Sequence, residues 1–254
     1  MIIINNPVKT KPFVSIITTT FNSEKYLSET LKSIQNQKKK NYELIIVDGK
    51  SNDQTLKIIK NFKKIINFCI SEKDKGIYDA FNKGLSYAKG KYIVFVNSDD
   101  ILTPNAIKFL SKYDLKYPDV DFIFGSVKKH WAILHGFYPK RIIYTWGFYS
   151  SHSTGFYIKN KSAQKIGKYN LKYKYHADFD YFYRMIVKHK MKGIGTKKNE
   201  LFGVFRRGGF SSMIDFKKSF LEDIRIRLDN NQNICLVMVI ALFKFIKNYN
   251  RFFK

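Results

Sequence analysis

Apolar and polar residues follow a regular order along the first part of this chain. Short runs rich in β-branched and aromatic residues are typical of buried strands, and the segments between them repeat apolar residues every three or four positions, as helices do. The pattern predicts strands at 13–20, 42–47, 65–70 and 92–96 and helices at about 23–37, 54–63, 77–88 and from 103 onward, with Gly90 ending the helix at 77–88. This alternation predicts an α/β fold, with helices on both faces of a mostly parallel sheet.

A polar loop follows each predicted strand. The four loops comprise residues 18–22, 48–53, 71–76 and 97–100. Because the carboxyl ends of parallel strands meet at one edge of a sheet, and open α/β sheets bind ligands beyond that edge, we expect the four loops to converge on one site.

The pattern changes after about residue 124. Aromatic residues such as Trp131 and Trp146, together with several glycines, indicate shorter strands and irregular connections. Helical spacing returns at 161–166 and at about 177–189. The sequence contains neither an internal repeat nor a low-complexity linker, so this half is expected to extend the same domain.

The composition leaves a large positive charge to explain. The chain of 254 residues has 46 Lys or Arg against 20 Asp or Glu, a formal net charge of +26, and 44% hydrophobic residues, enough for a core. Such a charge suits nucleic acid, an anionic membrane surface or phosphate-bearing substrates, and a compositional drift toward Lys, Asn and Ile explains part of it.

Two features bear on location. Cys69 and Cys235 are far apart and form no metal-binding pattern, which fits a reducing compartment. The first residues contain too short an apolar run for a signal peptide, and the longest apolar run, 234–243, is too short to span a bilayer. We therefore expect a cytoplasmic protein.

Carboxylates at strand ends are the strongest chemical signal. Asp99 and Asp100 follow a predicted strand, where two oxygen ligands can hold Mg²⁺ or Mn²⁺ carrying a diphosphate; the alternative is a polar turn. Asp48 can accept a hydrogen bond from a nucleobase or a ribose hydroxyl, or it can cap a turn. Asp53 is expected to be the N-cap of the helix that follows it.

Two other classes of protein lack support. A nucleic-acid-binding module would need a recognisable helix-turn-helix, zinc or RNA-recognition pattern, and none is found. A dinucleotide-dependent oxidoreductase would need a G-x-G-x-x-G turn after the first strand, where this chain has Thr-Thr-Phe-Asn.

Several stretches together resemble a known family. In order and spacing, four stretches resemble the family 2 glycosyltransferases of the GT-A fold, of the type that builds bacterial cell-surface polysaccharides. These stretches are FVSIITTTFNSEKYLSETLKSI, YELIIVDGKSNDQT, SEKDKGIYDAFNKGLSYAKGKYIVFVNSDD and LTP. A weaker resemblance continues through SHSTGFYIKNKSAQKIGKYN, HADFDYFYRM and RRGGFSS.

The resemblance implies a domain plan. Residues 1–212 would form one GT-A domain with a Rossmann-like, mostly parallel sheet. Its nucleotide-sugar-binding half would be 13–125 and its acceptor-binding half 126–212. Residues 213–254 would form a helical, amphipathic C-terminal extension.

The resemblance also implies roles for single residues on the donor side. The expected contacts with the nucleotide, ribose and diphosphate are Thr18, Thr20, Asn22, Asp48, Asp74, Lys75, Gly76, Asn97 and Ser98. Asn97 stands where the family's Asp-x-Asp motif has its first Asp. Asp99, helped by Asp100, is therefore the expected ligand of a divalent cation, Mn²⁺ or Mg²⁺.

On the other side of the site, Asp178 matches the family's catalytic base, with Ala177 where Glu is frequent. The alternative for Asp178 is a carboxylate that stabilises a helix N-terminus. His152 falls in a segment that borders the acceptor, and Arg206 and Arg207 lie in a loop that could close over the donor phosphates. A lone His is often structural, however, and exposed Arg pairs are often solvated.

The implied activity is inverting transfer of a hexose or N-acetylhexosamine from a nucleotide sugar. UDP-sugars are the commonest donors in the family, and a glycan or a polyprenyl-diphosphate-linked glycan is the expected acceptor. A family member that binds nucleotide sugars without catalysis is the alternative.

The charge is concentrated on the expected acceptor side. Residues 155–207 contain 14 Lys or Arg and three acids, which suits a lipid-diphosphate carrier at an anionic membrane. Residues 234–254 combine an apolar run with four cations, a pattern typical of an interfacial helix on a protein peripheral to the inner face of the cell membrane. The alternative is a helix packed on the domain or on a second subunit of a homodimer.

Overall fold

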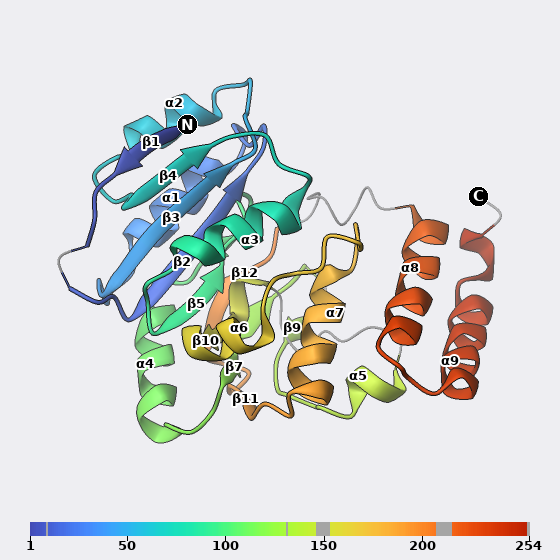
Figure 1. Ribbon diagram of the computed structural model, residues 1–254. Helices are drawn as coiled ribbons and strands as arrows, with labels where there is room; N and C mark the ends of the chain where they lie inside the picture. The colour runs from blue at the N-terminus through green and yellow to red at the C-terminus, as the bar shows by residue number, and fades with distance from the viewer. Residues whose placement is uncertain (9, 131, 146–152, 207–214, 253–254) are drawn as a thin grey trace.

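The computed structural model describes residues 1–254 except 9, 131, 146–152, 207–214 and 253–254. Among the described residues, eight strands form a central sheet in the order β1-β4-β3-β2-β5-β10-β7-β11, and four short strands form a second sheet in the order β6-β12-β8-β9 (Figure 1). The strands are β1 (Ile2–Asn5), β2 (Val14–Thr20), β3 (Tyr42–Asp48), β4 (Phe68–Ser71), β5 (Tyr92–Phe95), β6 (Ile101–Leu102), β7 (Phe122–Phe124), β8 (Ser126–Lys128), β9 (Ile133–Leu134), β10 (Phe156–Lys159), β11 (Gly193–Gly195) and β12 (Leu201–Val204).

Helices cover both faces of the central sheet. The α-helices of the described chain are α1 (Leu27–Gln35), α2 (Thr55–Asn61), α3 (Ile77–Tyr87), α4 (Ala106–Lys116), α5 (Arg141–Tyr144), α6 (Asn160–Ile166), α7 (Ala177–Tyr183), α8 (Phe216–Asp229) and α9 (Ile234–Lys247). One buried cluster joins alternate residues of β2, β3 and β5 to α1, α2 and α4, and the other joins the remaining residues of those strands to α3, α6 and α7. The predicted α/β fold with helices on both faces is confirmed.

The parallel core of the sheet is the part that positions the site. β2 pairs in parallel with β3 and β5, and β3 pairs in parallel with β4. All seven residues of β2 are buried. The carboxyl ends of these four strands therefore lie on one edge, as the sequence pattern predicts.

The sequence pattern misses the antiparallel strands. β1 pairs antiparallel with β4 at one edge of the sheet, and β10 is inserted antiparallel between β5 and β7. The partner of β10 in β5 lies more than sixty residues earlier in the chain, as in the pair Tyr157 and Val94. Local periodicity carries no information about such a pairing.

Two helix-end predictions need correction. The N-cap of α2 is Gln54 rather than Asp53, whose carboxylate instead accepts hydrogen bonds from the amides of Thr55 (2.9 Å) and Glu24 (3.1 Å). Gly90 does not end α3, because the C-cap is Ala88. Gly90 is needed for close packing, since a Cβ there would lie 2.5 Å from the backbone nitrogen of Ser15.

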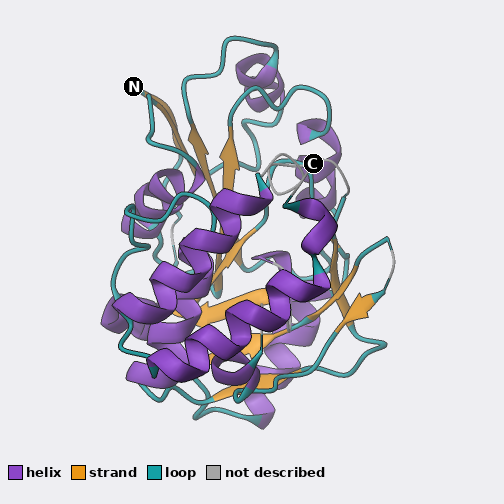
Figure 2. Cartoon of the chain, turned by 90° about the vertical axis from the view of Figure 1, so that its right-hand side faces the viewer, coloured by secondary structure: helices purple, strands orange, loops and turns teal. Residues whose placement is uncertain are grey.

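The C-terminal helices α8 and α9 lie at one end of the molecule, beyond α7 and α5 (Figures 1 and 2). Arg227, which is 0% exposed, connects α8 to the neighbouring segments. Its guanidinium donates to Gln232 Oε1 (3.0 Å) and to the carbonyl of Thr145 (2.7 Å), pairs with Asp223, and lies over the ring of Phe179. In the described part of the chain, no helix is long and apolar enough to cross a bilayer.

We predict that Arg227→Met lowers the free energy of unfolding by about 3–5 kcal/mol, because it leaves the buried carboxylate of Asp223 without its partner. Chemical denaturation monitored by circular dichroism measures the change. The matched control is Arg225→Met, two residues away on the same helix with an exposed side chain, which should change the free energy by less than about 1 kcal/mol. Equal effects of the two substitutions would show that the buried guanidinium does not hold α8.

Candidate functional site

The ends of β2 and β4 and the loop after β3 meet at the carboxylate of Asp48, which is 0% exposed. Oδ1 accepts hydrogen bonds from the hydroxyls of Thr20 (2.8 Å) and Ser51 (2.6 Å). Oδ2 accepts from the amide of Ser51 (3.0 Å) and the hydroxyl of Ser71 (2.6 Å). A carboxylate has about four acceptor positions, so this group is saturated by its own protein. Asp48 organises the edge of the sheet, and its contact with a nucleobase stays a prediction.

A second set of bonds joins the loop after β2 to its neighbours. The amide of Asn22 donates to Ser51 Oγ (2.9 Å), and that of Ser23 donates to Thr55 Oγ1 (2.7 Å). The hydroxyls of Ser23 and Ser98 lie 2.9 Å apart. Three of the predicted polar loops are therefore fixed to one another.

The donor positions after β2 differ in depth. Thr18 is 0% exposed, and its hydroxyl makes no hydrogen bond within the described residues. Thr20 is also buried, against Asp48, whereas Asn22 is exposed. Asn22 takes a left-handed backbone conformation (φ 46°), and its Oδ1 accepts a hydrogen bond from the amide of Asn52.

The loop after β4 brings Asp74 over the backbone of Gly49. A Cβ at Gly49 would lie 2.6 Å from Asp74 Oδ2, so a side chain there would displace that carboxylate. Partial burial raises the pKa of Asp74. Asp74 Oδ1 accepts the amide hydrogen of Gly76 (2.9 Å), whose φ of 113° favours glycine, and the neighbouring Lys75 is exposed.

The acidic segment after β5 contains two carboxylates in different settings. Asp100 is 0% exposed and accepts a hydrogen bond from Thr154 Oγ1 (2.9 Å). Burial, followed by the charge of Asp99, raises the pKa of Asp100 to about 7. Asp99 is half-buried, and burial raises its pKa as well. Asn97 donates to Ser153 Oγ (3.1 Å), and its buried Oδ1 makes no hydrogen bond within the described residues.

Arg206 fixes this segment to α1. Its Nε donates to the carbonyl of Asp99 (3.2 Å), Nη2 lies 2.5 Å from Glu29 Oε2, and the guanidinium stacks over the ring of Tyr26 at 4.3 Å. Arg206 thus lies beside the acidic pair, and its contact with the donor phosphates stays a prediction. His152 and Arg207 lie outside the described residues.

The candidate base Asp178 is the second residue of α7 and is half-buried. Its Oδ1 accepts hydrogen bonds from the hydroxyl of Tyr78 (3.0 Å) and from the amide of Phe179 (2.9 Å). The Tyr78 hydroxyl also lies 3.0 Å from the carbonyl of Tyr175. Tyr78 follows Gly76 by two residues, so its bond to Asp178 connects the start of α3, after the loop of Asp74 and Gly76, to the start of α7.

A carboxylate from α8 holds the segment that precedes Asp178. Glu222 accepts three consecutive backbone amide hydrogens, from Lys174 (2.7 Å), Tyr175 (2.6 Å) and His176 (2.7 Å). These amides lead into the N-terminus of α7, where a negative charge is favourable. Sequence reasoning misses both Glu222 and Tyr78, because no local pattern links residues that lie some 45 to 100 positions apart.

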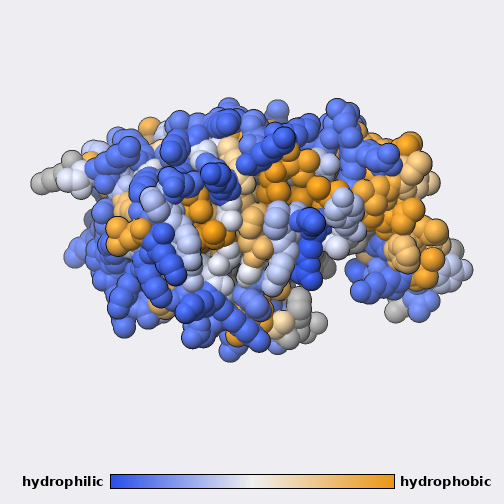
Figure 3. Space-filling view, turned by 90° about the horizontal axis from the view of Figure 1, so that it is seen from below, coloured by the Kyte–Doolittle hydropathy of each residue, from blue (hydrophilic) through white to orange (hydrophobic). Residues whose placement is uncertain are grey.

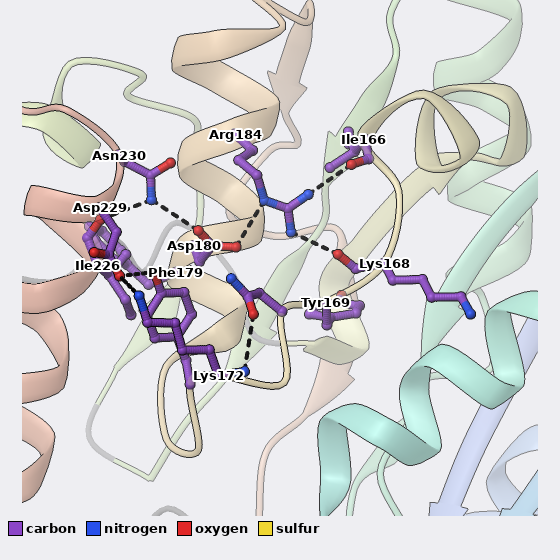
Figure 4. A network of polar contacts seen from close by, with 12 residues as sticks. Ile166, Lys168, Tyr169, Lys172, Phe179, Asp180, Arg184, Ile226, Asp229 and Asn230 are labelled. Carbon is purple, nitrogen blue, oxygen red and sulfur yellow. Dashed lines mark hydrogen bonds and ion pairs between the residues drawn. The ribbon is translucent and has the colours of Figure 1, made fainter.

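The far side of α7 is held by a second polar network (Figure 4). Asp180 accepts hydrogen bonds from Arg184 Nε (2.8 Å) and from Asn230 Nδ2 (2.9 Å), and Arg184 also donates to the carbonyls of Ile166 and Lys168. α7 is therefore fixed by polar contacts along its length, and this limits where Asp178 can move.

The residues present suit a divalent cation held partly by substrate. No group of three or more His, Cys, Asp or Glu side chains gathers at a possible metal site in the described part of the chain. Asp99 and the amide oxygen of Asn97 are oxygen donors of the kind that Mn²⁺ and Mg²⁺ prefer, and a cation would offset the burial that disfavours the charge of Asp99. Other ligands would have to come from a bound phosphate or water.

Comparison with known proteins gives the family. Residues 15–192 match the family described as Glycosyl transferase family 2. A PGL/p-HBAD biosynthesis glycosyltransferase of Mycobacterium tuberculosis is 31% identical over 246 residues, which cover 91% of this chain and 90% of the relative. An uncharacterised glycosyltransferase of Methanocaldococcus jannaschii is 33% identical over 191 residues, which cover 70% of this chain and 66% of the relative.

Solved structures share the fold. TarS of Staphylococcus aureus, crystallised with UDP-GlcNAc, matches with a TM-score of 0.68 and 20% identity, over 90% of this chain and 70% of that one. A mannosyltransferase of Pyrobaculum calidifontis, in complex with GDP-Man and Mn²⁺, matches with a TM-score of 0.64 and 15% identity, over 94% of this chain and 70% of that one.

We predict that Glu222→Ala frees the amides of residues 174–176 and lowers the free energy of unfolding by about 1–3 kcal/mol, because three donors lose their acceptor. Hydrogen–deuterium exchange at these amides should become faster. The matched control is Ser219→Ala, one turn earlier on α8, which removes only the contact with the His176 ring and should leave that exchange unchanged. Unaltered protection in Glu222→Ala would contradict the role assigned to Glu222.

Proposed function

The chain belongs to glycosyltransferase family 2, and we propose that it is an inverting enzyme that transfers a sugar from a UDP-sugar to a glycan or lipid-linked glycan in the synthesis of a surface polysaccharide. The observation that carries this proposal is the hydrogen bond between Tyr78 and Asp178. It brings the candidate base beside the start of α3, directly after the loop of Asp74 and Gly76 on the proposed donor side.

The chain's own residues supply the base and its orientation. Asp178 takes the proton from the acceptor hydroxyl, and that oxygen attacks the anomeric carbon from the face opposite the leaving nucleoside diphosphate. A single displacement without a covalent intermediate inverts the configuration at that carbon. The Tyr78 hydroxyl holds Oδ1 of Asp178, leaving Oδ2 to face the acceptor.

The donor is held beyond the carboxyl ends of β2 to β5. The polar positions that we assign to it are Thr18, Thr20, Asn22, Asp48, Asp74, Lys75, Gly76, Asn97, Ser98, Arg206 and Arg207. Asp99, with support from Asp100, would hold a divalent cation, which would supply positive charge beside the departing diphosphate. Mn²⁺ in the related mannosyltransferase structure supports this choice.

Structures of similar proteins support a choice of sugar donor, and the charge of the chain supports a choice of acceptor. UDP-GlcNAc in TarS supports a UDP-sugar, and GDP-Man in the mannosyltransferase makes GDP-sugars the first competitor. The basic stretch 155–207 suits an acceptor on a polyprenyl diphosphate at the inner face of the cell membrane, with His152 on the acceptor side. Thermal-shift screening against UDP, GDP and dTDP with Mn²⁺ separates the nucleotide classes.

A member of the family that binds nucleotide sugars without transfer is the second candidate. Ala177 and Asn97, which replace family carboxylates on either side of the site, favour it. Release of nucleoside diphosphate from a bound nucleotide sugar separates the two candidates, because only an active enzyme produces it.

We predict that Asp178→Asn lowers the rate of nucleoside diphosphate release by at least about a hundredfold, because general-base catalysis is lost. Its affinity for UDP, measured by calorimetry, should stay within about threefold, since the base contacts the acceptor rather than the nucleotide. Asp119→Asn, at an exposed carboxylate before β7, is the matched control and should behave as the unchanged protein. Full activity of Asp178→Asn would remove Asp178 from the mechanism.

We predict that Asp99→Asn weakens UDP binding in the presence of Mn²⁺ by about tenfold or more, since the half-exposed carboxylate is the main protein ligand of the cation. Binding without Mn²⁺ should change little. Titration calorimetry with Mn²⁺ and with EDTA measures both. If the gain in affinity from Mn²⁺ is the same in the variant, the cation is held elsewhere.

A further inference from the structure

The outward side of α9 is a continuous apolar face. Its exposed residues recur at helical spacing on one side, and their exposed fractions are between 50% and 71%: Ile234, Met238, Val239, Leu242, Phe243 and Ile246. The opposite side, with Val237, Ile240 and Ala241, is buried against α8. Figure 3 shows the hydrophobic surface gathered at the end of the molecule where α8 and α9 lie.

This face differs from other exposed apolar residues of the described chain. Leu115 and Leu171 are exposed singly on α4 and on the loop before α7, which is normal for a protein surface. An uninterrupted apolar helix face indicates a contact with a partner or with lipid.

The charges around α9 point to an anionic partner. Residues 230–254 contain no Asp or Glu and contain Lys244, Lys247, Arg251 and Lys254. Lys247 is exposed at the C-terminal end of α9, and Arg251 is exposed just beyond it and stacks on the ring of Phe216 of α8 at 4.3 Å. A parallel pairing of α9 from two copies of the chain would bring like charges together, which disfavours that form of homodimer at this surface.

The face belongs to a pair of helices, α8 and α9, that are capped and packed together. Asp215 and Asn233 accept backbone hydrogen bonds as N-caps of α8 and α9, and the ring of Phe252 packs against those of Phe216 and Phe245. α8 in turn holds the segment before Asp178 through Glu222. The outward face of α9 is thus attached to the helix that carries the candidate base.

We propose that the outward face of α9 docks on an anionic lipid bilayer, with the helix lying in the plane of the interface. The apolar side chains enter the boundary between headgroups and acyl chains, and Lys247 and Arg251 contact lipid phosphates. Since no described helix is long enough to span a bilayer, α9 lies on the membrane surface. The fixed connection to α7 keeps the acceptor side at a constant distance from the bilayer.

The test uses the full chain, without sugar donor or acceptor, and vesicles of phosphatidylglycerol and phosphatidylcholine in equal parts. Sedimentation should show binding to these vesicles and at least about tenfold weaker binding to pure phosphatidylcholine. Leu242→Asp/Phe243→Asp should weaken binding to the mixed vesicles by about tenfold or more. The matched control, Leu115→Asp/Leu171→Asp, should bind as the unchanged protein.

A charge variant tests the same surface without altering its apolar residues. Lys247→Glu/Arg251→Glu should weaken binding to the mixed vesicles, and added salt should reduce the difference from the unchanged protein. The proposal is overturned if the Leu242/Phe243 variant binds as tightly as its control. It is also overturned if the unchanged protein is a dimer that Leu242→Asp/Phe243→Asp converts to a monomer. Sugar transfer is not needed for either readout, so a failure here leaves the proposed reaction untouched.

Discussion

The proposed donor side of the site depends on one buried carboxylate. Asp48 is fully buried, and its four hydrogen bonds come from β2, from the loop after β3 and from β4, at Thr20, Ser51 and Ser71. A buried charge that loses its hydrogen-bond partners costs free energy, so separating these chain segments would destabilise the folded protein. Polar loops, which have little apolar surface to pack, are in this way held rigid enough to bind a ligand.

The base side depends on a second carboxylate that comes from beyond the family match. Glu222 lies in α8, after the matched residues 15–192, and binds the amides that lead into α7. The C-terminal helices therefore do two things in this account. α8 binds the segment before Asp178, and α9 presents an apolar face, so the proposed membrane contact and the candidate base are connected through α8.

Local patterns in the sequence are sufficient for the parallel core and insufficient for the contacts that complete the site. β2 and β3 are predicted because their residues are almost all apolar or β-branched, and the loops at 48–53 and 97–100 are predicted to converge because parallel strands share one edge. The insertion of β10, the burial of Asp100 and the bond from Tyr78 to Asp178 depend on pairings across 50 or more residues, which periodicity does not encode. Glu222 is missed for the same reason.

A crystal structure of the full chain with Mn²⁺ and the nucleotide sugar that stabilises it most would test the proposed placement of donor, cation and base directly. The diphosphate should lie beyond the carboxyl ends of β2 to β5 and the cation at Asp99, and the anomeric carbon should face Asp178 across a space that admits an acceptor hydroxyl. A nucleotide bound away from that edge, or a sugar whose anomeric carbon is turned from Asp178, would contradict it.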